Sequence, residues 1–121
     1  MNLGIHLLDE VTRGQLIDQM SKLNFDDAAA AVRHFAYLAR SGKRFSRDDV
    51  VTIFDAAGMS AEQVPAALAE LTTSQTLESY PKDGTIAYFM ERGARIDYGD
   101  RLGHPSRDPR WSASSATQAT S

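Results

Sequence analysis

The chain has 121 residues, a formal net charge of −3 and no cysteine. This length predicts one compact domain, and 42% hydrophobic with 24% charged residues is the composition of a globular protein. The absence of cysteine excludes disulfides, thiolate metal ligands and a cysteine nucleophile. No apolar run approaches the ~20 residues of a membrane span, and the N-terminus lacks the features of a signal peptide. We therefore expect a cytoplasmic protein that does not bind membranes.

Helix starts are indicated by four pairs with capping-box spacing, in which a short polar residue is followed three positions later by a residue that reaches back. The pairs are Thr12–Gln15, Asn24–Asp27, Ser46–Asp49 and Ser60–Gln63. Apolar residues recur at three- and four-residue steps after each pair. Together these patterns predict helices over residues 12–23, 25–41, 46–57 and 60–73.

After residue 75 the apolar period changes from 3.6 to 2. Residues 76–80 and 85–90 are β-capable, and Pro81-Lys82-Asp83-Gly84 between them is a turn sequence. This arrangement predicts a β-hairpin with Leu77, Ile86 and Tyr88 facing inward. The predicted core consists of apolar residues from the helices and the hairpin: Phe35, Leu38, Ile53, Phe54, Val64, Leu68, Leu71 and Ile86.

Beyond Arg92 the periodic pattern ends. Residues 93–102 contain Gly93, Gly99 and alternating charges, and residues 103–121 are rich in Pro, Ser, Thr and Ala. The second of these segments has too little apolar surface to offset the entropy of ordering. The sequence thus predicts a flexible C-terminal tail over residues 93–121, with Trp111 as its one large apolar side chain beyond residue 103.

Residues 45–89 carry a recognisable order of elements. FSRDDVVTIFDAAG forms a first helix, Gly58-Met59-Ser60 a tight turn, AEQVPAALAELTTSQ a second helix and TLESYPKDGTIAYFM a hairpin. The helix at 25–41 and a short strand at residues 43–45 precede them. This order resembles the winged helix-turn-helix superfamily over about half of the chain.

The resemblance implies a mainly α (α+β) fold, with a helical core and a C-terminal two-stranded β-hairpin wing plus an extra N-terminal helix. The chain then divides into an N-terminal helical extension (1–24), a winged helix domain (25–92) and the tail (93–121). The extension carries Leu16, Met20 and Leu23 on one stripe. This stripe is a candidate homodimer surface, and packing within the same domain is the equal alternative.

The resemblance also implies binding to duplex DNA, with the second helix of the motif in the major groove and the wing on the backbone. The chain is then expected to be a small DNA-binding protein, a transcriptional regulator that is dimeric. Its candidate contacts combine cations with neutral hydrogen-bonding groups: Arg44, Arg47, Gln63, Thr73 and Lys82.

The charge of the motif favours a different partner. Residues 46–75 hold Arg47 as their one cation against five carboxylates, a net charge of −4. Because phosphate neutralisation supplies most non-specific DNA affinity, this surface opposes DNA binding. Glu62 and Glu70 instead form a candidate acidic face for a protein partner. The alternative function is a protein-interaction module, an adaptor or an inhibitor, and the sequence leaves both hypotheses open.

Catalysis finds little support. His6, His34 and His104 lie far apart on different predicted elements, and neither a metal-binding motif nor a glycine-rich phosphate loop occurs. The acidic pair Asp48-Asp49 suits the first turn of a helix, where negative charge complements the helix dipole. The sequence therefore predicts no enzyme activity, no cofactor, no metal and no small-molecule substrate.

Overall fold

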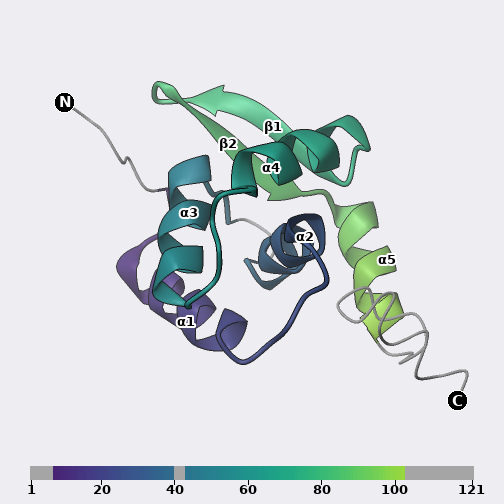
Figure 1. Cartoon of the computed structure of the whole chain (residues 1–121). Coiled ribbons are helices and arrows are strands. Elements are labelled where there is room, and N and C mark those ends of the chain that lie inside the picture. The colour runs from purple at the N-terminus through teal and green to yellow at the C-terminus, as the bar shows by residue number, and fades with distance from the viewer. Residues whose placement is uncertain (1–6, 40–42, 103–121) are drawn as a thin grey trace, which may run out of the picture.

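The computed structural model describes residues 7–39 and 43–102. In this part of the chain, five helices and a two-stranded antiparallel sheet follow one another: α1 (Glu10–Met20), α2 (Ala28–Leu38), α3 (Arg47–Ala56), α4 (Val64–Thr73), β1 (Leu77–Lys82), β2 (Thr85–Met90) and α5 (Arg92–Leu102). The predicted α+β class is thereby confirmed. The hairpin and α4 lie on one side of the other helices, and α5 lies at the edge beside α2 (Figure 1).

The capping box of α3 forms as predicted. The Ser46 hydroxyl accepts from the backbone N–H of Asp49 at 3.1 Å, and the Asp49 carboxylate accepts from the N–H of Ser46 at 2.9 Å. Asp49 also accepts from the N–H of Leu7 at 3.0 Å, although its side chain is fully buried. The carboxylate therefore ties the N-terminal segment to α3, which goes beyond the dipole role that the sequence suggested.

Two other helix starts differ from their predictions. The cap of α1 is Asp9, which accepts from the N–H of Thr12 at 2.7 Å, and the cap of α2 is Asp27, which accepts from the N–H of Ala30 at 2.8 Å. The predicted caps Thr12 and Asn24 are wrong because an aspartate stands three residues away from each in the chain. A carboxylate accepts more strongly than a neutral oxygen, so the aspartates begin the helices.

The start of α4 is also later than predicted. The helix begins at Val64 after Gln63, which makes no side-chain cap hydrogen bond. Pro65 therefore lies in the first turn, where its missing N–H removes no intrahelical bond. Ser60 and Glu62 remain in the connection that precedes the helix, where the Ser60 hydroxyl accepts from the N–H of Glu62 at 3.4 Å.

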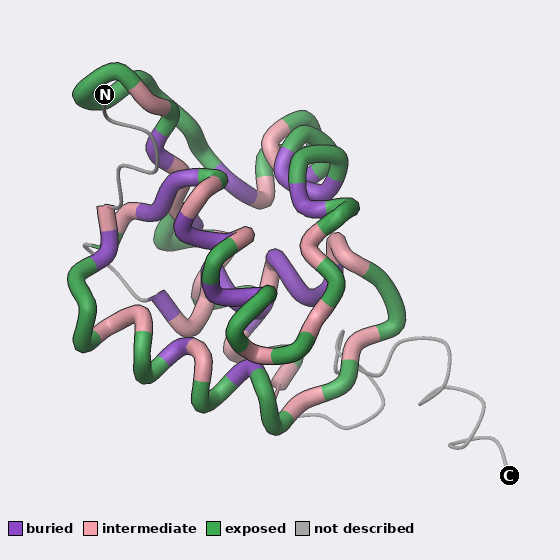
Figure 2. The backbone as a smooth tube through the Cα atoms, turned by 60° about the vertical axis from the view of Figure 1, so that its left-hand side comes forward, coloured by how far each residue is buried: buried purple, intermediate pink, exposed green. Residues whose placement is uncertain are grey.

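The core lies where the helices face one another (Figure 2). Phe35 of α2 packs edge-on against Phe45 and Phe54, with ring centroids 5.0 and 6.2 Å apart. Most of the predicted core is confirmed as buried: Phe35, Ile53, Phe54, Val64, Leu68 and Leu71. Leu38 is half-buried, and Ile86 is wrong, since 43% of it is exposed.

The register of the hairpin explains the error at Ile86. Leu77 pairs with Met90, and Pro81 pairs with Ile86. Since side chains alternate across a strand, Leu77, Tyr88 and Ile86 lie on one face, as predicted. Leu77 and Met90 at the base are buried, Tyr88 is half-buried, and Ile86 near the tip is exposed. The predicted face is correct, but the tip extends beyond the helices that cover the base.

The predicted tail is wrong over residues 93–102, which belong to α5 (Arg92–Leu102). Its packing side repeats every four residues: Tyr98 is buried, and Ala94 and Leu102 are packed against the core. Gly99 lies against Tyr37, because a Cβ at Gly99 would stand 3.1 Å from the Tyr37 Oη. The sequence concealed this helix because its apolar stripe has only three residues and charged residues stand between them. Residues 103–121 of the predicted tail, with Trp111, lie outside the described residues.

The stripe offered as a dimer surface packs inside the domain. Leu16 and Met20 of α1 are 2% and 0% exposed and belong to the core, while Leu23 is half-buried. α1 lies against α3 in Figure 1. Of the two alternatives, packing within the domain describes this helix.

Candidate functional site

The basic segment before α3 lies along the hairpin. Phe45 and Tyr88 form an antiparallel bridge: the N–H of Phe45 donates to the Tyr88 carbonyl at 3.1 Å, and the N–H of Tyr88 donates to the Phe45 carbonyl at 2.7 Å. β2 therefore has β1 on one side and the segment around Phe45 on the other. This pairing brings Arg44 and Arg47, neighbours of Phe45 in the chain, to the hairpin.

Arg44 and Lys82 line one open hollow of about 410 Å³ together with Lys43 and Tyr80. We call it the Lys82 hollow; Leu7 completes its lining. The Arg44 guanidinium stands 4.0 Å from the centroid of the Phe89 ring, a distance at which a cation is attracted to the ring face. The Tyr80 ring packs edge-on against the Phe89 ring, with their centroids 6.0 Å apart. Cations and aromatic rings thus share one surface.

Arg47 lies on the other face of the hairpin. It lines a second hollow of about 270 Å³ with Asp48 and the tip residues Gly84, Thr85 and Ile86; Tyr88 completes this lining. We call it the tip hollow. Asp48 offsets part of the Arg47 charge there. The hairpin tip is consequently flanked by Lys82 and Arg44 on one face and by Arg47 on the other.

The charges of the Lys82 hollow are partly offset. Lys43 Nζ stands 3.7 Å from the Asp9 carboxylate. The hydrogen bond from the backbone of Thr12 lowers the pKa of the Asp9 carboxyl below its ordinary value, and Lys43 lowers it further. Asp9 therefore remains ionised at neutral pH and neutralises Lys43. Arg44 and Lys82 have no ion pair within the described residues, so they carry the positive charge of this surface.

The α4 side bears no cation, because residues 48–81 contain neither Lys nor Arg. Glu70 and Thr73 are exposed on α4, whereas Glu62 and Gln63 precede the helix. Glu62 therefore lies outside α4, contrary to the helix expected over residues 60–73, and both glutamates are exposed. The structure separates the candidate contacts into a basic hairpin group and an acidic and neutral α4 group.

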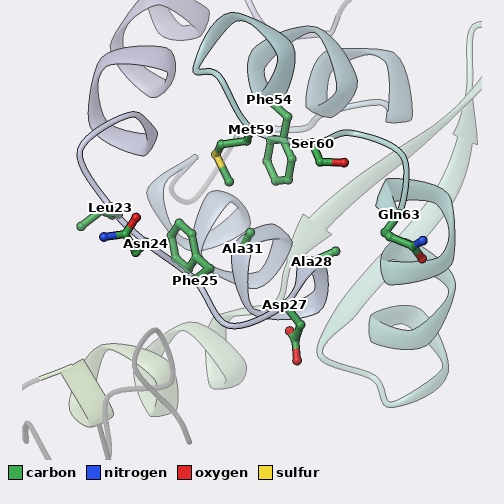
Figure 3. Close-up of a pocket in the computed structure, with 10 residues that line it drawn as sticks. All are labelled: Leu23, Asn24, Phe25, Asp27, Ala28, Ala31, Phe54, Met59, Ser60 and Gln63. Carbon is green, nitrogen blue, oxygen red and sulfur yellow. The ribbon is translucent and has the colours of Figure 1, made fainter. Parts of the chain in front are cut away.

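A third cavity, the apolar pocket, lies between the α1–α2 connection, α2 and the α3–α4 connection. It has a volume of about 310 Å³ and is lined by Phe25, Ala31, Phe54 and Met59, with Gln63 at its margin (Figure 3). Figure 3 shows that the side chains of Phe25, Phe54 and Met59 point toward one another across this pocket. Gln63 is therefore closer to this pocket than to the hairpin cations.

The buried histidine of α2 makes a structural contact. His34 Nδ1 lies 2.7 Å from the Tyr98 hydroxyl, and both residues are buried. Within residues 7–39 and 43–102 no group of three His, Asp or Glu side chains is arranged to hold a metal ion.

Sequence reasoning missed the aromatic pair Tyr80 and Phe89 beside the cations of the Lys82 hollow. The sequence pattern predicts only that Tyr80 and Phe89 lie in strands. Their proximity follows from the register of the hairpin, which pairs Tyr80 with Ala87 and Glu78 with Phe89. The alternation of side chains along each strand was the signal that could have placed them on one face.

Comparisons with protein-family models, curated proteins and solved structures found no match to this chain. Among the described helices, none combines the length and the apolar character needed to cross a membrane.

Proposed function

We propose that this chain is a small winged-helix DNA-binding protein of the transcriptional-regulator type. The order α2, Phe45 segment, α3, α4, β1 and β2 supports the proposal, since it matches the element order of that superfamily. The bridge between Phe45 and Tyr88 adds a third extended segment beside β2, where the superfamily has a short strand. In this proposal the hairpin is the wing.

The observation that carries the DNA proposal is the Lys82 hollow. Arg44 and Lys82 are free to neutralise phosphates, and Tyr80 and Phe89 provide ring surfaces beside them. Phosphate neutralisation supplies the sequence-independent part of DNA affinity. Arg47 at the tip hollow extends the cationic surface around the hairpin. The wing and the segment before α3 are thus the main contacts, in place of α4.

Sequence recognition would then depend on neutral groups. α4 and its connection offer Gln63 and Thr73, which can hydrogen-bond to base edges. Neither supplies charge, so we expect modest specificity and a large electrostatic share of the affinity. A homodimer through a surface other than α1 remains part of this proposal, because one small unit gives limited affinity.

The proposal is tested by fluorescence anisotropy of a labelled duplex titrated with the full chain at several salt concentrations. Phosphate contacts make log K fall with log salt at about −0.9 per phosphate neutralised. Changing both Arg44 and Lys82 to Ala should weaken binding to all sequences alike. The same change should reduce the slope by about 1 for each phosphate that is no longer neutralised.

The matched control is Lys22→Ala. Lys22 is an exposed cation near the end of α1, paired at 3.2 Å with Asp18, and it lies outside both hollows. The control should bind as the wild type does. Failure of the folded wild type to bind duplex DNA even at low salt would reject the proposal, as would an equal effect of the control.

The second candidate function is a winged-helix protein-interaction module, an adaptor or inhibitor. It is favoured by the absence of Lys and Arg from residues 48–81 and by the exposure of Glu62 and Glu70. A basic protein would meet these carboxylates at the α4 side, and long-range attraction would speed its association. Replacement of the two glutamates by Gln distinguishes the two functions. It removes repulsion from DNA phosphates if the partner is DNA, and it removes attraction to the partner if that partner is a basic protein.

A further inference from the structure

Arg33 of α2 forms no ion pair in the part of the chain that the structure describes. Its Nε is buried and makes no hydrogen bond there. The guanidinium carbon stands 5.9 Å from the centroid of the Tyr98 ring, which is a weak contact at the limit of cation–π range. A buried donor on a charged group that lacks an acceptor is costly. No carboxylate of the described residues forms an ion pair with this guanidinium, so the position favours an anion beside it.

Arg33 borders a hollow of about 190 Å³, the Arg33 pocket, between α2, α5 and the connection from α4 to β1. The pocket also holds the second cation Arg101 and the neutral side chains of Gln75 and Thr76. Arg101 Nε lies 3.2 Å from the Asp97 carboxylate, which offsets one of the two positive charges. The remaining positive charge belongs to Arg33. Asp97 also lines the pocket, and Met90, Ala94 and Tyr98 form the rest of the lining.

We propose that the Arg33 pocket binds a small oxyanion of the phosphate class, free or as a phosphomonoester. The guanidinium group presents donors in a fixed fork that matches phosphate oxygens. Gln75 and Thr76 add neutral donors from a different element, and Arg101 adds a second guanidinium, so groups from three elements line the space that an oxyanion would occupy. The bound anion would offset the guanidinium charge of Arg33, which no ion pair among the described residues offsets.

The pocket is separate from the proposed DNA surface. None of its lining residues lines the Lys82 hollow or the tip hollow. The proposal consequently stands or falls independently of DNA binding. Gln75, with φ 66°, and Thr76 form the joint between α4 and β1, so an anion here would contact the segment that connects α4 to the hairpin.

The test is an NMR titration of the ¹⁵N-labelled full chain with inorganic phosphate, at ionic strength held constant with chloride. The arginine Nε–H resonances report each side chain separately. We expect the Arg33 signal to shift and to saturate. Arg33→Gln should lower phosphate affinity by about tenfold or more, because hydrogen bonds to charged groups are among the stronger ones.

Two variants keep the test decisive. Arg92→Gln removes an exposed charge on α5 outside the pocket and should leave phosphate affinity unchanged. Arg33→Lys keeps the positive charge but loses the forked guanidinium donors. This variant should therefore fold, and it should bind phosphate more weakly than the wild type does. In addition, phosphate should raise the thermal midpoint of the wild type and of Arg92→Gln but not of Arg33→Gln.

Three outcomes would overturn the proposal. The first is an Arg33 signal that does not move, or moves without saturating. The second is an equal loss of affinity in Arg92→Gln. The third comes from a parallel titration with duplex DNA: if the duplex shifts the Arg33 signal and inorganic phosphate does not, the pocket belongs to a nucleic-acid surface and is not a small-anion site.

Discussion

The Nδ1 atom of His34 and the hydroxyl of Tyr98 lie 2.7 Å apart and join α2 to α5 across 64 positions of the chain. Both side chains are buried, and their ring centroids are 5.7 Å apart. Arg95 reinforces the joint by donating from Nη1 to the Tyr37 carbonyl at 3.1 Å. α5 is consequently held to the core by polar as well as apolar contacts.

We first predict that α5 contributes to global stability. Tyr98→Phe removes the hydroxyl and should cost about 0.5–1.5 kcal/mol, the usual net value of a hydrogen bond. Tyr98→Ala also removes the buried ring and should cost roughly 3–5 kcal/mol, as truncation of a large core aromatic does. Denaturant midpoints measure both, and Ile96→Ala at an exposed position of α5 is the control. Neutral effects of both Tyr98 variants would show that α5 is detached in solution.

A second prediction concerns the buried carboxylate of Asp49. It accepts from the N–H groups of Ser46 and Leu7, so Asp49→Ala leaves both donors without this acceptor and removes the α3 capping box. The expected loss is roughly 2–4 kcal/mol of unfolding free energy. Asp48→Ala, next to it and less buried, should cost much less. Equal costs in chemical denaturation would contradict the role assigned to Asp49.

The third prediction is a pH dependence at α1. The pKa of Asp9 is lowered by the Thr12 N–H, so the folded state binds its proton less readily than the unfolded state does. The stabilisation is therefore complete above the ordinary pKa of an aspartate and is lost as the pH falls through the lowered value. Asp9→Asn keeps a cap but does not titrate.

The difference in stability between wild type and Asp9→Asn should thus shrink on acidification, measured by denaturation at a series of pH values. A difference that stays constant across the acidic range would contradict the assignment of the lowered pKa to this cap.

The fourth prediction separates DNA from a protein partner. Changing Glu62 and Glu70 to Gln should strengthen duplex binding, because two repulsive charges are removed. If a basic protein is the partner, the same change should slow its association. Anisotropy and association kinetics distinguish these results, and Glu10→Gln, an exposed carboxylate on α1, is the control. If neither assay changes, the α4 side contacts neither DNA nor a protein partner.

The fifth prediction tests the core at the apolar pocket. Phe54 is 1% exposed and contacts Phe35 edge-on, so Phe54→Ala should cost about 3–5 kcal/mol. Met59 at the same pocket is half-buried, so Met59→Ala should cost less unfolding free energy than Phe54→Ala. The thermal or denaturant midpoint measures both. An unchanged midpoint for Phe54→Ala would show that α3 presents a different face to the core.

The local pattern of the sequence was sufficient to predict the existence and order of helices α1 to α4 and of the hairpin. Their boundaries were less secure, because several polar residues compete to cap each helix. At α1 and α2 the aspartates Asp9 and Asp27 prevail over Thr12 and Asn24, while at α3 the Ser46–Asp49 pair forms as its spacing predicts. Periodicity reports which face is apolar, and it does not report how far that face is covered. Ile86 is exposed for that reason.

The sequence by itself determined the α+β class and most of the core, since these follow from short-range periodicity, and residue type alone offered Arg44, Arg47 and Lys82 as candidates. Tertiary structure decided which distant residues meet. Only the Phe45–Tyr88 bridge brings Arg44 to Phe89 and Lys82, and only the packing of α5 on α2 makes the Arg33 pocket. The physical reason is that a helix with a short apolar stripe among charged residues, such as α5, gains its stability from a partner surface, which local sequence does not encode.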